Sequence, residues 1–231
     1  MDTMISTNYN NLTPSEAVAL QKELRDKVQL TPLQHPVKTV AGADISFNKF
    51  SEIVYAGIIV LSYPDMQPIA QSGVVTSTKF PYIPGLLGFR EVPALVEAWN
   101  KLDTKPDVLI LDGHGIAHPR RMGIATHFGL VAHTPTLGCA KSLLTGKYEE
   151  PGQLPGSTSP LVDKGEIIGE VLRTKLKCKP VYISPGHLIT QGQSLEIIKN
   201  CIGKYRIPEP TRLAHLLVNQ LRTGNHSERL F

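Results

Sequence analysis

A nearly continuous apolar run, Tyr55–Tyr63, constrains the fold of this chain more than any other segment. The run is shorter than the roughly 18 apolar residues of a membrane-spanning helix, and it leaves no face suited to water. It therefore indicates a central strand that is buried on both faces. The chain has 231 residues, of which 41% are hydrophobic and 19% are charged, as in an ordinary globular protein. We expect an α/β fold in which helices flank a sheet.

Strand-like and helix-like patterns alternate along the rest of the chain. Thr13, followed by Pro14, supplies a helix start signal, and the Pro-, Gly- and Ser-rich segment Tyr148–Pro160 predicts a surface loop. Helices are expected at Ser15–Leu30, Leu86–Leu102, Met122–Val131, Ser194–Cys201 and Thr211–Leu221. Strands are expected at Val37–Phe47, Tyr55–Tyr63, Ile69–Thr78, Val108–Leu111, Thr136–Ala140, Glu166–Thr174 and Pro180–Ser184. With no repeat or linker in the pattern, residues 1–231 are expected to form a single domain with a mixed sheet.

Features of the whole chain argue against several protein classes. Residues Met1–Asn10 are polar and lack the apolar core of a signal peptide, and no segment is apolar enough for a membrane helix. Cys139, Cys178 and Cys201 lie far apart and show no zinc-like spacing, which favours a reducing compartment. The net charge of +4 tolerates a polyanionic partner without proving one. We expect a cytoplasmic monomer without membrane contact.

Asp44 is an acidic residue in the middle of the strand expected at Val37–Phe47. The alternation of a strand places it on one face together with Gly42 and Ser46. A carboxylate inside a central strand is costly to bury unless a positive charge neutralises it. By itself, this pattern also fits an edge strand with a solvated aspartate.

Two further carboxylates can join Asp44. Asp112 ends the apolar run Val108–Leu111, at the strand end where open α/β sheets place their ligand sites. Adjacent parallel strands would bring the two aspartates within a few ångströms, where a divalent cation would remove their repulsion. Glu91 lies at the border of an apolar helical stripe, although a first-turn glutamate can also serve only the helix dipole. Together, the three carboxylates predict an oxygen-rich site suited to Mg²⁺ and phosphodiester cleavage.

Five stretches of the chain resemble the endonuclease V family, the deoxyinosine-specific DNA repair nucleases. They are Ala41–Asp44, Pro81–Glu91, Asp112–Arg121, Gly138–Lys141 and Pro208–His215. They follow one another in order from residue 41 to residue 215, so the resemblance covers nearly the whole chain. The second and third stretches are long and highly specific.

The resemblance implies an RNase H-like fold and a Mg²⁺-dependent deoxyribonuclease, with Mn²⁺ as a substitute cation. It assigns Asp44, Glu91 and Asp112 to the catalytic metal site and places His215 close by. It also brings Lys141 to the scissile phosphate, where a cation stabilises the charge of the transition state. The implied reaction is hydrolysis of the second phosphodiester bond 3′ to a deaminated base, which leaves 3′-hydroxyl and 5′-phosphate ends.

An aromatic residue between two prolines precedes the helix that carries Glu91. The prolines restrict the backbone and would hold Tyr82 outward at low entropic cost. Such a stiff apolar tip can enter a base stack, whereas an aromatic packed on the core is the ordinary alternative. The resemblance makes the segment a strand-separating wedge formed by Pro81, Tyr82, Ile83 and Pro84. It also implies a lesion pocket at Gly85, Leu87 and Gly113 and contacts to the DNA backbone from His118, Arg120 and Arg121.

Two interpretations remain open for His215. On its expected helix, it lies opposite the apolar stripe Leu213, Leu217 and Leu221, and this pattern predicts a solvent-facing histidine. The resemblance instead places it beside the metal, at a position where the family carries either Asp or His. Its role as a direct ligand or as a neighbour of the ligands is therefore open.

Two alternative functions share most of these features. A ribonuclease for inosine-containing RNA would have the same metal site and the same wedge. A nucleic-acid-binding module without activity would keep the fold alone. Retention of Asp44, Glu91, Asp112 and Lys141 argues against the second alternative, because a module without activity has no need of all four.

Overall fold

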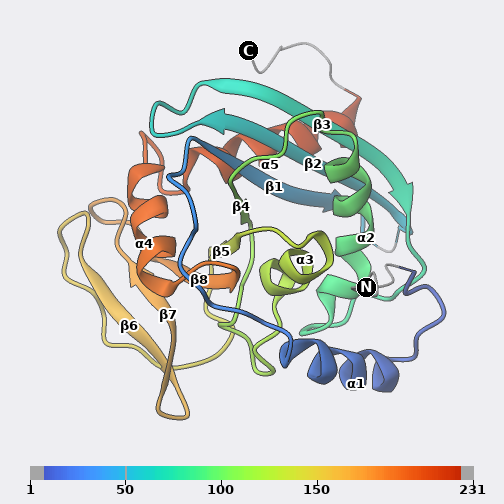
Figure 1. Cartoon of the computed structure of the whole chain (residues 1–231), viewed down its shortest axis with the longest axis horizontal. Helices are drawn as coiled ribbons and strands as arrows, with labels where there is room; N and C mark the ends of the chain where they lie inside the picture. Colours follow the sequence, from blue (N-terminus) through green and yellow to red (C-terminus); the bar gives the residue numbers. More distant parts are fainter. Residues whose placement is uncertain (1–7, 50, 225–231) are drawn as a thin grey trace.

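One mixed sheet of eight strands runs through the molecule, in the order β3-β2-β1-β4-β5-β8-β7-β6 (Figure 1). The computed structural model describes residues 8–49 and 51–224. The strands are β1 Thr39–Phe47, β2 Ile53–Ser62, β3 Pro68–Ser77, β4 Val108–Leu111, β5 Thr136–Ala140, β6 Thr158–Asp163, β7 Glu166–Leu172 and β8 Val181–His187. The helices are α1 Pro14–Arg25, α2 Leu87–Asn100, α3 Ile124–Ala132, α4 Gln191–Asn200 and α5 Glu209–Thr223.

The strand directions divide the sheet into a parallel centre and antiparallel flanks. Strands β1, β2 and β3 form an antiparallel meander, whereas β4 and β5 lie parallel to β1. Strands β8, β7 and β6 continue the sheet in antiparallel pairs beyond β5. The expected α/β class with a mixed sheet is confirmed, and the order of the first five strands is the RNase H-like one.

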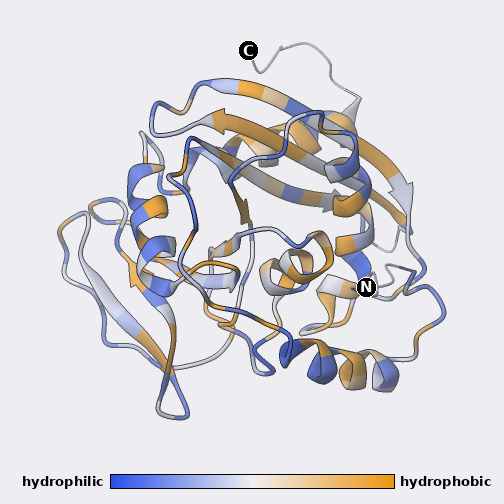
Figure 2. Ribbon diagram, viewed as in Figure 1, coloured by the Kyte–Doolittle hydropathy of each residue, from blue (hydrophilic) through white to orange (hydrophobic). Residues whose placement is uncertain are grey.

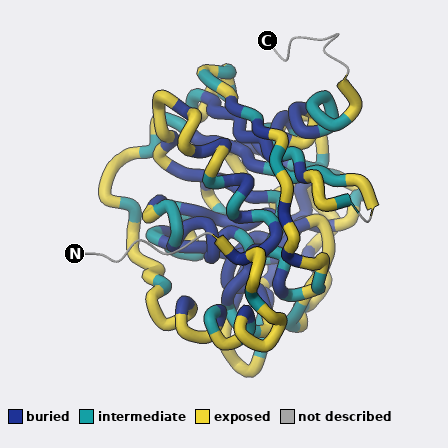
Figure 3. The backbone as a smooth tube through the Cα atoms, turned by 90° about the vertical axis from the view of Figure 1, so that its right-hand side faces the viewer, coloured by how far each residue is buried: buried dark blue, intermediate teal, exposed yellow. Residues whose placement is uncertain are grey.

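Helices cover both faces of the sheet (Figures 1 and 2). Helices α2 and α3 pack on one face, and α4 and α5 pack on the other. Strand β2 contributes to both layers, with Ile58 and Val60 buried under α2 and α3, and Ile59 and Leu61 in the opposite cluster. Its apolar run is therefore buried on both faces, as the sequence predicts. Figure 3 shows the exposed residues concentrated in the outer turns. Among the described residues, no helix is long and apolar enough to cross a membrane.

Helix α1 begins where the sequence predicts and ends earlier than expected. The Thr13 side chain accepts a hydrogen bond from the Glu16 N–H, and the Glu16 carboxylate accepts one from the Thr13 N–H, which forms a capping box. The helix ends at Arg25 instead of Leu30. The Gln29 carbonyl accepts a 2.7 Å hydrogen bond from the Leu188 N–H, so a tertiary contact with the end of β8 replaces the last helical turn.

Strand β6 was not expected from the sequence. Its first residues, Thr158–Pro160, fall in the segment predicted as a loop, yet they pair with β7. Pro160 cannot donate a ladder hydrogen bond, and it is tolerated here because β6 is the outermost strand. Turn-forming residues therefore concealed an edge strand from pattern reading.

Helix α5 lies very close to β1, the strand that carries Asp44. A Cβ atom on Gly42 would lie 2.0 Å from the Pro210 carbonyl oxygen, at the first turn of α5. Only a residue without a side chain allows this contact. Gly42 therefore sets how closely the helix lies on the strand.

We predict that Gly42→Ala lowers the free energy of unfolding by about 1–3 kcal/mol, because the added methyl group has no room against the α5 backbone. Chemical denaturation monitored by circular dichroism measures the change. Gly192→Ala is the control, because a Cβ at Gly192 meets nothing within 4 Å. Equal stability of the two variants would show that α5 yields without cost.

Candidate metal centre and nucleic-acid site

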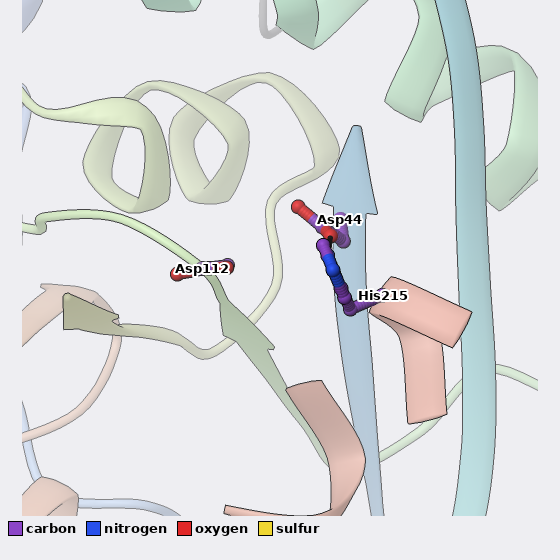
Figure 4. Close-up of side chains that lie close together, drawn as sticks. All are labelled: Asp44, Asp112 and His215. Carbon is purple, nitrogen blue, oxygen red and sulfur yellow. Dashed lines mark hydrogen bonds and ion pairs between the residues drawn. The ribbon is translucent and has the colours of Figure 1, made fainter. Parts of the chain in front are cut away.

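Asp44, Asp112 and His215 converge at the carboxyl ends of the central parallel strands (Figure 4). Asp44 lies in β1, Asp112 follows β4 directly, and His215 comes from α5. Because Ala43 pairs with Leu111 in parallel register, the next residue of each strand is an aspartate. One ligand atom from each of the three side chains lies within 4.8 Å of the others. This cluster can hold a metal ion.

His215 is half-exposed and also contacts the cluster. Its Nδ1 donates to the Asp44 Oδ2 at 2.7 Å, and its Nε2 accepts from the Asn219 Nδ2 at 3.0 Å. Both ring nitrogens are thus engaged. The Asn219 amide nitrogen can only donate, which makes Nε2 the acceptor and Nδ1 the donor. The exposure predicted from the helical pattern and the position implied by the resemblance are compatible, because the His215 ring is half-exposed while its Nδ1 is bonded to Asp44.

Burial and like charge make Asp44 difficult to ionise. The pKa of Asp44 is raised above its ordinary value, first by burial and then by the negative charge of Asp112. Hydrogen bonds from His215 and from the Ile45 N–H, the latter 2.8 Å long, oppose the rise. A divalent cation between Asp44 and Asp112 would relieve the same repulsion, so the two carboxylates suit a metal ion.

Glu91 faces the same region from α2. It lies outside the group of three but lines a cavity together with Asp112. Burial of its carboxyl group raises its pKa to about 8, and the charge of Asp44 contributes to this rise. The Arg90 guanidinium opposes the rise. Two carboxyl groups with raised pKa values, Asp44 and Glu91, beside the charge of Asp112 fit a site built for a cation with oxygen ligands.

Lys141 pairs with one of these acids, Asp112. It follows β5 directly, and its Nζ forms an ion pair with the Asp112 Oδ2. Its side chain is 42% exposed, so the ammonium group is also open to a ligand from solvent. Lys141 therefore provides a positive charge at the rim of the acidic cluster.

A cavity of about 300 Å³ opens beside the cluster. Glu91, Asp112 and Tyr82 are among the residues that line it. Its lining includes the three residues expected in a lesion pocket: Gly85, Leu87 and Gly113. The Tyr82 side chain is 57% exposed, and its ring lies 5.8 Å from that of Phe47, so the wall of the cavity ends in an open aromatic tip.

The Gly85 carbonyl anchors the loop behind Tyr82. It accepts hydrogen bonds from His118 Nε2 at 3.1 Å, from Arg120 Nη2 at 2.8 Å and from Gln21 Nε2 at 3.0 Å. His118 Nδ1 accepts from the Arg120 N–H, and burial lowers the pKa of His118 to about 4, so the ring is neutral and donates through Nε2. Gly85 has a φ of 81°, a conformation that glycine adopts without strain. The loop is thereby held in one position.

Arg121 points away from this cavity. Its guanidinium forms ion pairs with Asp163 at 2.9 Å and with Glu166 at 2.8 Å, and its side chain is only 16% exposed. It joins the loop after β4 to the turn between β6 and β7. Contact of Arg121 with DNA therefore stays a prediction. Of that predicted trio, His118 lines the cavity, and Arg120 is bonded to the carbonyl of Gly85, a lining residue.

Comparison with known proteins agrees with this geometry. The sequence model of the endonuclease V family matches residues 22–216. An endonuclease V of Myxococcus xanthus is 49% identical over 216 residues, covering 93% of this chain and 92% of the relative. The chain belongs to the endonuclease V family. The resemblance stated from the sequence is confirmed.

Solved structures of the family have the same fold. That of the Streptomyces avermitilis endonuclease V has a TM-score of 0.88 and 37% identity, with 93% of this chain and 95% of that chain covered. That of the Ciona intestinalis endonuclease V, in complex with a 24-mer DNA containing an inosine followed by a ribo-adenosine, has a TM-score of 0.79 and 28% identity. The match covers 91% of this chain and 98% of the Ciona chain.

Gln21 is a site residue that sequence reasoning missed. It is buried in α1 on the stripe that includes Ala17 and Leu24, so an amide on an apolar face was the available signal. Its Nε2 donates to the Gly85 and Met122 carbonyls, and its Oε1 accepts from Arg120 Nε. One amide of this endonuclease V family member thus joins α1 to both walls of the cavity.

We predict that divalent metal binding releases a proton from Glu91. With its pKa raised to about 8, Glu91 is mostly protonated at pH 7, and a cation needs the carboxylate. Calorimetric titration with Mg²⁺ in two buffers of different ionisation enthalpy should detect about one proton released at pH 7 and far less at pH 9.5. Glu91→Gln should abolish most of the release. Unchanged release in that variant would assign the proton to another group.

We predict that Gln21→Leu loosens the loop that carries Tyr82. Leucine keeps the packing volume but removes a donor from the Gly85 carbonyl and the partner of Arg120 Nε. Amide hydrogen exchange in peptides covering residues 81–88 should accelerate by roughly tenfold, as expected for the loss of one to two hydrogen bonds. Exchange in β4 and α5 serves as the internal control. Equal protection of the loop in both proteins would contradict the anchoring role.

Proposed function

We propose that this endonuclease recognises deoxyinosine in DNA and hydrolyses the second phosphodiester bond on its 3′ side, leaving 3′-hydroxyl and 5′-phosphate ends. The observation that carries the proposal is the contact between the acidic cluster and the cavity: Asp112 belongs to both, and Glu91, which also lines the cavity, is close enough to feel the charges of Asp44 and Asp112. A base held in the cavity would bring the following backbone to the acids. The Ciona relative, which was solved with inosine-containing DNA, supports this class of substrate.

The acidic donors suit Mg²⁺, with Mn²⁺ as a substitute. Asp44, Asp112 and Glu91 would hold the cation through carboxylate oxygens, the ligands that it prefers. When bound, the cation would polarise the scissile phosphate and make water a better nucleophile. His215 would act by positioning Asp44, since its Nδ1 is bonded to that carboxylate and its Nε2 to Asn219. The family also carries aspartate at position 215. That residue would lose the hydrogen bond to Asp44, but it would leave all the carboxylate oxygens of the site in place.

Lys141 would stabilise the charge that develops on the phosphate. Its ammonium group pairs with Asp112 and remains half-exposed, so it can face the scissile group without leaving the cluster. A positioned cation at developing negative charge lowers the barrier by a few kcal/mol in typical cases. Lys141 would thus be a catalytic residue together with the three acids.

Base recognition would divide between the open aromatic tip and the cavity behind it. Tyr82, held among Pro81, Ile83 and Pro84, would enter the stack left by the displaced base, which a 57% exposed ring can do without unfolding the loop. Main-chain groups near Gly85 and Gly113, beside the Leu87 side chain, would contact the base. His118, Arg120 and Arg121 would supply the backbone contacts implied by the family.

We further propose that the protein acts as a cytoplasmic monomer. Cys139, Cys178 and Cys201 are all free thiols, which agrees with a reducing compartment.

The proposal is tested by mapping cuts in matched duplexes that carry deoxyinosine, deoxyuridine, an abasic site or no lesion. Incubation with Mg²⁺ should cut the deoxyinosine strand alone or preferentially, at the second bond on its 3′ side. Asp112→Asn should lower the single-turnover rate by roughly 100-fold or more and leave binding of the inosine duplex within about threefold, because it removes a ligand charge and spares the cavity. The matched control is Asp103→Asn, an exposed aspartate outside the site.

Matched RNA carrying inosine is the further arm of this experiment. Cleavage of the RNA alone would replace the proposal with the ribonuclease alternative. Binding without cleavage of any substrate would favour the module without activity. Near-normal cleavage by Asp112→Asn would remove Asp112 from the metal site.

A further inference from the structure

A second cavity, of about 600 Å³, lies on the other side of Lys141. One wall is the segment that follows β5, residues 141–143, and the other is the turn between β7 and β8. The residues that give it its character are Lys141, Leu143, Tyr148, Arg173, Lys177 and Lys179. Ser142 and Leu143 also line the cavity beside the acids, so the two cavities meet at this segment.

The turn between β7 and β8 is strongly basic. Lysines occur at every second position, namely Lys175, Lys177 and Lys179, and the last two are exposed and line the cavity. Among the described residues that line it, the one carboxylate is Glu150, which forms an ion pair with the buried Arg173. The positive charges of Lys177 and Lys179 therefore face the groove without an acidic residue of its lining to neutralise them.

Two arginines hold this basic turn in place. The Arg206 guanidinium donates to the carbonyls of Lys141 at 2.8 Å, Lys179 at 2.7 Å and Pro180 at 2.7 Å. Arg173 donates to the carbonyls of Cys178 at 2.5 Å and of Gly152 at 2.9 Å. The two walls of the groove are thus fixed to each other and to Lys141, which is the preorganisation that a binding surface needs.

The topology puts the groove at the same end of the strands as the acidic cluster. Ala140 pairs with Tyr182, and Leu172 pairs with Val181, so the end of β7 and the start of β8 lie beside the end of β5. Asp112 lines the first cavity and pairs with Lys141, and Lys141 lines the basic groove, so the acids connect the two.

We propose that this groove binds the sugar–phosphate backbone of the DNA strand on the 3′ side of the cleaved bond. The inference rests on the proposed function, which places the lesion in the first cavity and the scissile phosphate at the acids. A strand that passes the acids in that direction enters the groove. Lys177 and Lys179 contact its phosphates, and Arg173 and Arg206 position the turn. After cleavage, the groove holds the strand that carries the 5′-phosphate.

The test combines a double variant with shortened substrates. Lys177→Asn with Lys179→Gln removes both charges, and asparagine tolerates the left-handed backbone at position 177, where φ is 59°. The matched control is Lys38→Gln with Lys101→Gln. These two lysines are exposed and lie before β1 and after α2, toward the amino ends of the central parallel strands and away from the acids. The inosine duplexes extend either about 12 or about 3 nucleotides beyond the cut on its 3′ side. The longer flank fills the groove and the shorter one does not, because such a groove spans only a few phosphates. Fluorescence anisotropy without divalent metal measures binding, and single-turnover assays measure cleavage.

We predict that the unaltered protein binds the shortened duplex roughly tenfold more weakly than the long one, since phosphate contacts dominate affinity. The groove variant should bind the long duplex roughly tenfold more weakly than the unaltered protein does, with a slope against salt reduced by about 2, and it should lose nothing further on truncation. Its maximal cleavage rate at saturating protein should be unchanged. The control variant should behave like the unaltered protein.

Equal effects of the two double variants, or full sensitivity of the groove variant to truncation, would overturn the proposal. A protein that binds according to the length of the 3′ flank but cuts no inosine duplex would disprove the proposed function and leave the groove supported. The two proposals can therefore fail separately.

Discussion

The parallel pairing of β1 and β4 is the constraint on which the rest of the structure depends. It places Asp44 and Asp112 side by side, with one oxygen of each within 4.8 Å of the other, where two like charges repel. The surroundings offset this repulsion without removing it. His215 donates to one aspartate, and Lys141 pairs with the other. The raised pKa values of Asp44 and Glu91 show that a cost remains, and this cost is what a bound cation would relieve.

Around this centre, polar side chains hold two loops in place by bonding to carbonyl oxygens. Gln21, His118 and Arg120 meet at one carbonyl oxygen, that of Gly85, and so fix the loop behind Tyr82. Arg206 performs the same task for the basic turn between β7 and β8. These side chains bond to carbonyl oxygens, so they order the loops without forming ion pairs with the exposed lysines. At this turn, the lysines that are open to a polyanion, Lys177 and Lys179, are therefore different from the arginine that holds the turn in place.

The outline of the fold followed from periodicity, but the edges of elements did not. The apolar run of β2 and the capping signal at Thr13 are local properties, so reading them required no partner. Strand β6 escaped because Pro160 resembles a loop residue until a neighbouring strand makes it an edge. The end of α1 depends on a contact with Leu188, more than 150 residues away in sequence, and no local pattern contains such information.

The sequence by itself determined the fold class, the family and the identity of the acids, because these are carried by residue types at short spacing. Only the tertiary structure decided how those residues act together. It showed that His215 can be exposed and still bond to Asp44, since one helix edge can face both solvent and strand. It also turned Arg121 toward Asp163 and Glu166. The direction of a long side chain depends on which distant loops fold against it, and spacing along the chain does not encode that direction.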